Sequence, residues 1–375
     1  MMAENYTPDE YVNPKDFVSD LLPHYSTLIL DENAPAGKQL ESLIRSFVYL
    51  REDSLYPIIT SYMMLSQKWS KVCPVLFCYG LPGTGKSTLS ILAAYLHNQE
   101  YTFSSSDTFP SIRNALDTLR WLDEGKEYER DGAILCWDNL GADTLRRDPR
   151  LYQLLLFGYN RNTDKMMIAN SDGTNKVFHV FCPKILSSVE PLHLDPEFQE
   201  LHRRFLVIHH QKNEDAQLES LSDYDFSNFP KLFFDFWHYK QNCLTYVATR
   251  TSISRRKWSI SETRKTVSID LATIHSLIYQ VSTDESISLL SSYWTELDSK
   301  THGKPNLEVF LEQFMTLEFV KLDAMNIKYL QPMVVSDYIK SLVTQSRIDV
   351  IEARSCKTVM GKLGYVLKPQ GWMRV

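Results

Sequence analysis

One short segment of the sequence carries the residue types that hold a phosphate group. Residues 80–87 read Gly-Leu-Pro-Gly-Thr-Gly-Lys-Ser and satisfy the pattern G-x-x-x-x-G-K-[ST] in full. In this pattern the glycines let backbone N–H groups converge on phosphate oxygens, the lysine reaches the outer phosphates, and the serine hydroxyl binds Mg²⁺. The predicted phosphate contacts are Gly80, Pro82, Gly83, Thr84, Gly85, Lys86, Ser87 and Thr88.

A carboxylate at the end of a second apolar run could complete a metal site. Asp138 directly follows the run "AILCW" over residues 133–137. An aspartate in this position, at the end of a buried strand, suits the residue that holds Mg²⁺ together with the loop hydroxyl. We therefore predict that Ser87 and Asp138 bind the metal and that Lys86 and Asp138 are catalytic. The alternative is an aspartate in an ordinary turn after a strand.

Signatures of other phosphate-loop proteins are missing. A GTPase would carry an Asn-Lys-x-Asp guanine reader, and a transporter ATPase would carry a segment like L-S-G-G-Q; the 375 residues contain neither. We therefore expect ATP with Mg²⁺ as the cofactor.

Elements around the loop alternate between strand and helix patterns. Apolar runs over residues 72–79, 133–137, 176–189 and 203–211 are separated by segments with apolar residues at spacings of three and four. This alternation predicts an α/β fold with a parallel sheet.

Composition divides the chain into four regions. We predict a helical N-terminal region over residues 1–70 and a phosphate-loop ATPase core over residues 71–212. Residues 213–303 are predicted to form a helical lid and a basic linker region, with a weakly patterned linker around residues 282–304. Residues 304–375 follow the order helix, helix, strand, turn, strand, which predicts a winged-helix-like module.

The layout after Asp138 resembles the AAA+ and superfamily 3-type helicase ATPases attached to primases in phages, plasmids and mobile elements. The resemblance rests on residues 160–192, which include the strand pattern "FCPKILSS", and on "DPEFQELHRRFLVIHH" over residues 195–210. It implies an AAA+-like core in which Ser187 or Ser188 senses the γ-phosphate. It also implies that Arg203 or Arg204 enters a neighbour's site as an arginine finger.

An arginine finger would require a homo-oligomer, such as a hexameric ring. The alternative for Arg203 and Arg204 is a pair of cations at a helix C-terminus, where positive charge is favoured. The same resemblance places Arg161 and Lys165 in a segment that could touch DNA, with a solvated turn as the alternative.

Asn139 bears on hydrolysis, because AAA+ ATPases commonly carry glutamate directly after the metal-binding aspartate. An amide can orient a water molecule but cannot accept its proton. Either Asp107 or Asp143 supplies the acid, or hydrolysis is slow, or the chain mainly binds and senses ATP.

Two basic stretches are candidates for nucleic-acid contact, although the net charge of the chain is −6. Residues 240–270 hold seven Lys or Arg against two acids, with a tryptophan among them, which suits phosphate contact and base stacking. A solvated linker is the alternative for this stretch, and protein docking is the alternative for the terminal module. The candidate residues are Arg255, Arg256, Lys257, Trp258, Arg354, Lys357 and Lys362.

The chain is expected to be cytoplasmic and without a membrane segment. Its six cysteines form no C-x-x-C pair, and its first residues are acidic and polar rather than a signal peptide.

Three hypotheses remain. The first is an oligomeric ATPase of helicase or replication-initiation type that acts on single-stranded or forked DNA, with a primase or another replication protein as partner. The second is an ATP-dependent switch that recruits a nuclease, transposase or replisome protein without translocating. The third is a scaffold that binds ATP without hydrolysing it.

Overall fold

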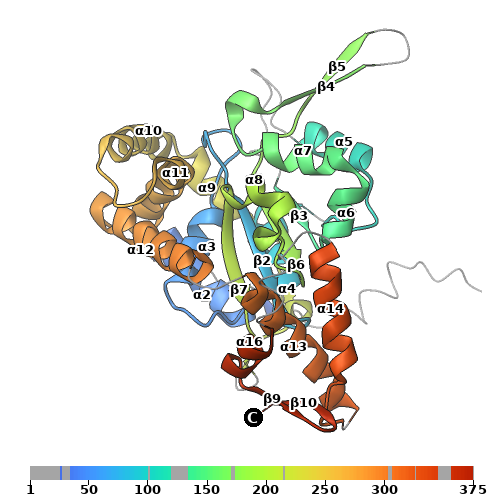
Figure 1. Cartoon of the computed structure of the whole chain (residues 1–375). Coiled ribbons are helices and arrows are strands. Elements are labelled where there is room, and N and C mark those ends of the chain that lie inside the picture. Colours follow the sequence, from blue (N-terminus) through green and yellow to red (C-terminus); the bar gives the residue numbers. More distant parts are fainter. Residues whose placement is uncertain are drawn as a thin grey trace, which may run out of the picture.

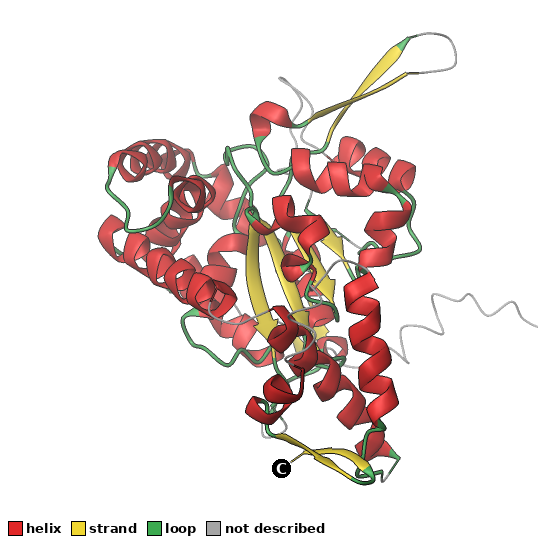
Figure 2. Ribbon diagram, viewed as in Figure 1, coloured by secondary structure: helices red, strands yellow, loops and turns green. Residues whose placement is uncertain are grey.

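Four parallel strands form the centre of the computed structural model (Figures 1 and 2). They are β2 (Val75–Gly80), β3 (Leu135–Trp137), β6 (Lys184–Ser188) and β7 (Phe205–His210), in the order β3-β6-β2-β7. The structure describes residues 26–27, 34–99, 102–119, 134–169, 174–213, 216–302, 306–325, 327–344 and 356–374. The predicted α/β class with a parallel sheet is confirmed.

The sheet is buried on both faces, which is why its strands read as continuous apolar runs. In β2, Leu76 and Cys78 belong to one hydrophobic cluster, while Val75 and Phe77 belong to a second cluster on the opposite face. The second cluster is covered by α5 (Phe109–Leu119), α6 (Ala142–Arg147), α7 (Pro149–Phe157) and α8 (Gln199–His202).

The first cluster is covered by helices that come before, between and after the strands of the sheet in the chain. They are α2 (Ala36–Phe47), α3 (Leu55–Met63), α4 (Lys86–Leu96), α9 (Lys231–His238), α10 (Lys240–Arg255), α11 (Glu262–Tyr279) and α12 (Thr283–His302). Of these helices, α2 and α3 precede the glycine-rich loop, in a region for which the sequence predicts helices. No helix in the described part of the chain is both long and apolar enough to cross a lipid bilayer.

The predicted linker around residues 282–304 is wrong, because α12 fills it. Ile287, Leu290, Tyr293 and Trp294 lie along one side of this helix and are buried against the first cluster. Serines beside and between these positions weaken the apolar pattern in the sequence, whereas tertiary contacts along one side of the helix are enough to stabilise it.

A third hydrophobic cluster lies within the last seventy residues. It joins α13 (Asn306–Ala324), α14 (Pro332–Thr344), α16 (Cys356–Lys362) and the antiparallel hairpin of β9 (Tyr365–Lys368) and β10 (Gly371–Arg374). Within the described residues, α14, α16 and the hairpin follow α13 in the order that the sequence predicts, and their assignment to a winged helix stays a prediction.

A second antiparallel hairpin extends away from the sheet (Figure 1). It consists of β4 (Lys165–Ala169) and β5 (Asn175–His179), in a segment whose sequence predicts a loop followed by a strand-rich run. The remaining short elements are β1 (Ser26–Thr27), β8 (Tyr224–Asp225), η1 (Arg161–Thr163), η2 (Leu192–Leu194), η3 (Pro196–Phe198) and η4 (Leu221–Asp223).

Candidate nucleotide-binding site

The glycine-rich loop lies between the carboxyl end of β2 and the N-terminus of α4. Gly80 has φ 150°, and a Cβ there would lie 2.2 Å from the carbonyl oxygen of His210 on β7. Gly85 has φ 85° at the N-cap of α4, in the left-handed region that favours glycine. The loop therefore needs these glycines in order to turn from the strand into the helix beside β7.

The Lys86 ammonium lies against the loop itself. Its Nζ donates to the carbonyl oxygens of Gly80 at 2.9 Å and Leu81 at 2.6 Å. Burial lowers the pKa of Lys86, an effect that Cys78 and Asp138 oppose. The side chain is thus held within the loop, with its charge next to the N-terminus of α4.

Three polar side chains from three elements meet at the carboxyl edge of the sheet. The Ser87 hydroxyl of α4 lies 2.9 Å from both carboxylate oxygens of Asp138, the residue that follows β3. The Ser187 hydroxyl of β6 also donates to Asp138. Ser188 is not part of this group, because its hydroxyl accepts from the Glu190 N–H at 3.0 Å. Of the two predicted serines, only Ser187 contacts Asp138.

Asn139 has a conformation that accounts for its residue type. Its φ is 55°, in the left-handed region that asparagine tolerates better than most residues, and its N–H donates to the Ser187 hydroxyl at 3.0 Å. A glutamate at this position would be disfavoured by roughly 1 kcal/mol. The amide is therefore compatible with the backbone that places Asp138.

The two alternative acids have different surroundings. Asp143 pairs with Arg146 at 3.2 Å, and the same guanidinium binds Asp195 and Glu197. Asp107 is half-buried and accepts from the Ser104 N–H at 2.7 Å.

The segment that carries Asp107 lies beside β3. Phe103 forms a parallel bridge with Trp137, and the Asp138 N–H donates to the Phe103 carbonyl at 2.7 Å. Since parallel strands advance together, the next residue, Ser104, lies level with Asp138. Asp107, which is bonded to Ser104, is therefore at the same edge of the sheet.

The arginine pair lies in the turn after α8. Arg203 is the C-cap residue of this helix and lies 3.7 Å from Glu200. The Arg204 guanidinium lies over the Tyr159 ring, 4.7 Å from its centroid. Within one chain, these positions fit the alternative that the two arginines lie at a helix C-terminus. The arginine-finger role needs a neighbouring subunit and stays a prediction.

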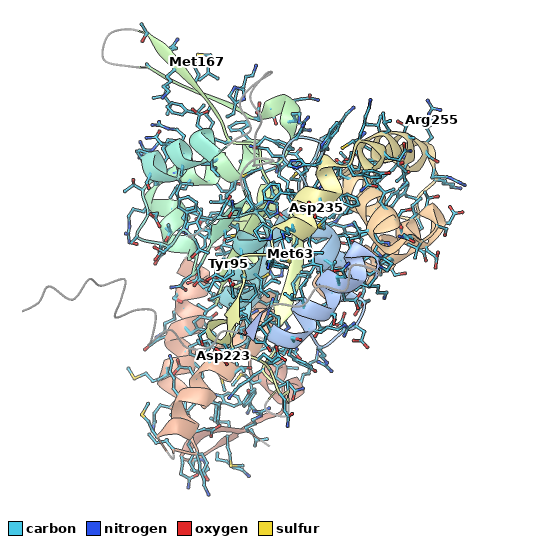
Figure 3. The ribbon with its side chains drawn as sticks, turned by 180° about the vertical axis from the view of Figure 1, so that it is seen from behind. Met63, Tyr95, Met167, Asp223, Asp235 and Arg255 are labelled. Carbon is cyan, nitrogen blue, oxygen red and sulfur yellow. The ribbon has the colours of Figure 1, made fainter. Side chains whose placement is uncertain are left out.

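The basic stretch after α10 is only partly available to a partner. Arg255, Arg256 and Lys257 are exposed, and Arg255 lies at the outer end of α10 (Figure 3). Trp258 is only 8% exposed, and its indole N–H donates to the Ile253 carbonyl at 3.4 Å. The prediction that Trp258 stacks on bases is therefore wrong, because the ring packs into the first hydrophobic cluster.

The candidates in the terminal module are described only in part. Lys357 and Lys362 are exposed on α16, while Arg354 lies outside the described residues. Figure 1 shows α10 and α16 in different parts of the molecule, so the two basic groups do not form one surface.

The residues at the hairpin of β4 and β5 differ in how accessible their side chains are. Arg161 at its base donates to the Gln67 carbonyl and lies over the Phe181 ring, so its side chain is engaged within the protein. Lys165 is exposed, and Met167, which projects at the far part of the hairpin (Figure 3), is 67% exposed. Lys165 remains available for a partner.

His210, which no sequence pattern singled out, connects β7 to the glycine-rich loop. Its Nδ1 lies 3.2 Å from the Thr84 carbonyl, which can only accept, so Nδ1 carries the proton. Burial lowers the pKa of His210 from 6.5 to about 4. The neutral ring therefore anchors the loop next to Lys86.

Acid is expected to destabilise the fold between pH 6.5 and about 4. The pKa values of His97, His210 and His275 are all lowered from 6.5 to about 4, mainly by burial. In this window the unfolded chain binds the protons and the folded chain does not. Each histidine therefore removes about 1.4 kcal/mol of unfolding free energy per pH unit as the pH falls.

Urea unfolding from pH 7.5 to 4.5 measures this dependence. His97→Gln should reduce the slope by one proton. An unfolding free energy that stays constant between pH 6.5 and 4.5 would contradict the assignment.

Comparisons with known proteins add little to this geometry. No family model matches the chain, and no curated protein matches it. A solved structure described as "SCCmec type IV Cch - active helicase" is similar with a TM-score of 0.39 and 11% sequence identity, covering 94% of this chain and 70% of that chain. A likeness at this level supports no conclusion about activity.

Proposed function

We propose that the chain is an ATPase that binds ATP with Mg²⁺ at the carboxyl edge of β2 and acts on DNA as an oligomer. The observation that carries the proposal is the contact of the Ser87 hydroxyl with both Asp138 oxygens at 2.9 Å. Ser87 is exposed, so this pair can be reached from solvent. A hydroxyl and a carboxylate at an open edge fit a hard cation, and Mg²⁺ in phosphate-loop NTPases is held by this donor set.

The loop residues would bind the phosphates and position them. Backbone N–H groups at the start of α4 provide donors and the positive end of a helix dipole. Lys86 would exchange the carbonyl oxygens of Gly80 and Leu81 for phosphate oxygens. Mg²⁺, when bound, neutralises charge on the outer phosphates. Ser187 would keep the Asp138 carboxylate oriented.

Asp107 is the better candidate to accept the proton of the attacking water. Asn139 has no basic atom for this role, and Asp143 is committed to Arg146. Asp107 lies at the edge that carries Asp138, through the Ser104 contact. A positioned base typically contributes 10²–10⁴-fold to rate.

Contact with DNA is proposed for the hairpin of β4 and β5. Lys165 and Lys176 are exposed on its two strands, and Met167 and Val177 add exposed apolar surface. Lysines can neutralise backbone phosphates, so binding should weaken as salt rises. Lys357 and Lys362 of α16 would form a separate contact.

An ATP-dependent switch that does not translocate is the second candidate. Asn139 favours it, because the position after Asp138 carries no acid. Such a switch would assemble on ATP and recruit another protein.

ATP turnover with and without single-stranded or forked DNA tests the proposal, together with the molecular mass in each state. We expect DNA to raise turnover and ATP to increase the mass. Assembly without stimulation by DNA would favour the switch. A chain that neither binds nor hydrolyses ATP would refute both.

A further inference from the structure

Lys184 is a fully buried lysine at the start of β6. Its relative exposure is 0%. Its Nζ donates to three carbonyl oxygens, of Gly158 at 2.5 Å, Cys182 at 2.8 Å and Val180 at 3.1 Å. Within the described residues its other contact is the Cys182 sulfur at 3.6 Å. Burying an ammonium is costly unless it is hydrogen-bonded, so the folded structure depends on these three carbonyl oxygens to hold Lys184 in the interior.

The three carbonyls belong to the two ends of the segment that forms the hairpin of β4 and β5. Gly158 precedes the hairpin, whereas Val180 and Cys182 follow it. The base is closed further by the Val180 N–H, which donates to the Asp164 carbonyl at 2.9 Å, and by a 2.9 Å contact between His179 Nδ1 and Asp164. The ammonium therefore joins both legs of the hairpin to β6.

The same strand reaches the candidate nucleotide site. Ser187, three residues after Lys184, donates to Asp138. At about 3.3 Å per residue, the two positions lie about 10 Å apart along one strand. The Tyr62 hydroxyl also lies 2.7 Å from both the Lys184 N–H and its carbonyl oxygen, so the backbone at this point is fixed as well.

We infer that Lys184 is a positioning residue that makes the hairpin follow changes at Asp138 and Ser187. One end of β6 contacts the residues proposed to hold ATP and Mg²⁺. The other end binds the base of the hairpin through the Lys184 ammonium. This inference rests on the proposed function, which identifies the ligand as ATP with Mg²⁺. In it, Lys184 transmits the effect of that ligand to the hairpin.

Gly158 provides an independent way to disturb the same contact. Its φ is −74°, which alanine adopts without strain, but a Cβ would lie 2.6 Å from Lys184 Nζ and 2.4 Å from the Val180 carbonyl oxygen. Gly158→Ala should therefore displace the ammonium while keeping it in the chain. Lys184→Met removes the ammonium at nearly constant side-chain length.

The experiment measures amide hydrogen exchange in residues 165–169 and 175–179 of the full chain, with and without a non-hydrolysable ATP analogue. In the unmodified protein the analogue should change exchange there by about fivefold or more. Lys184→Met and Gly158→Ala should each abolish this response while the affinity for the analogue stays within about threefold. DNA stimulation of turnover should fall to the basal rate in both variants.

A control variant distinguishes loss of the hairpin response from a general loss of protein stability. Leu206→Ala in β7 removes a fully buried side chain that the ammonium does not contact, and it should lower the melting temperature yet keep the hairpin response. A response that persists in Lys184→Met or Gly158→Ala would overturn the inference, as would an unmodified protein that binds the analogue without any change in the hairpin. Failure of the unmodified protein to bind the analogue would instead refute the proposed function.

Discussion

Asp138→Asn is expected to lower ATP turnover by about 10³-fold without unfolding the protein. The Asp138 carboxylate accepts from the hydroxyls of Ser87 and Ser187, and an amide of the same size would keep only one acceptor and lose the charge. A neutral group cannot balance a divalent cation, so transition-state charge on the phosphates would be left uncompensated. Steady-state turnover at saturating ATP and Mg²⁺ measures the effect, with thermal unfolding as the check on folding.

The same substitution at two other aspartates provides matched comparisons. Asp143→Asn should leave turnover within about twofold, because Asp143 is exposed and pairs with Arg146. Asp107→Asn should lower turnover by about 10²-fold with unchanged ATP binding if Asp107 accepts the proton. Turnover that survives Asp138→Asn would show that the metal site lies elsewhere, and turnover that survives Asp107→Asn would exclude Asp107 as the base.

Asp270→Asn is expected to reduce the unfolding free energy by about 3–5 kcal/mol. Asp270 of α11 is fully buried, and its Oδ2 accepts the backbone N–H groups of Lys71 and Val72 just before β2. Its Oδ1 accepts from Tyr246 and Arg250 of α10, each at 2.5 Å. An asparagine would turn an NH₂ group toward these donors and leave the Arg250 charge without a partner.

Urea unfolding measures this loss, and Asp284→Asn is the matched control. Asp284 is largely exposed and lies 3.7 Å from Arg256, so its replacement should change stability by less than about 0.5 kcal/mol. A loss below 1 kcal/mol at Asp270 would show that this carboxylate does not tie α10 and α11 to the start of β2.

Local patterns in the sequence were enough for most of the core. The pattern at residues 80–87 depends on glycines and on residues next to one another in the chain, so it can be recognised without a fold. The apolar runs of β2, β3, β6 and β7 follow from burial on both faces of the sheet. The helices before and after the loop follow from apolar spacing.

Residues with more than one possible environment were harder to interpret. Trp258 lies among basic residues in the sequence, yet its ring is buried against α10 and the first cluster. In the sequence, Asn139 suggests that a catalytic acid is missing. In the structure its backbone is left-handed, a conformation that asparagine tolerates, and this explains the residue type. In both cases the neighbours in space, or the backbone dihedral, decide the role.

The glycine-rich pattern at residues 80–87, the aspartate after another apolar run and the parallel α/β core around them could all be predicted from the sequence. Three contacts became evident from the fold alone: Ser187 rather than Ser188 contacts Asp138, Asp270 joins α11 to the start of β2, and Lys184 binds the base of a hairpin. Each of these contacts joins residues from elements that are far apart in the chain. Strand register and side-chain direction set them, and spacing along the sequence does not reveal either.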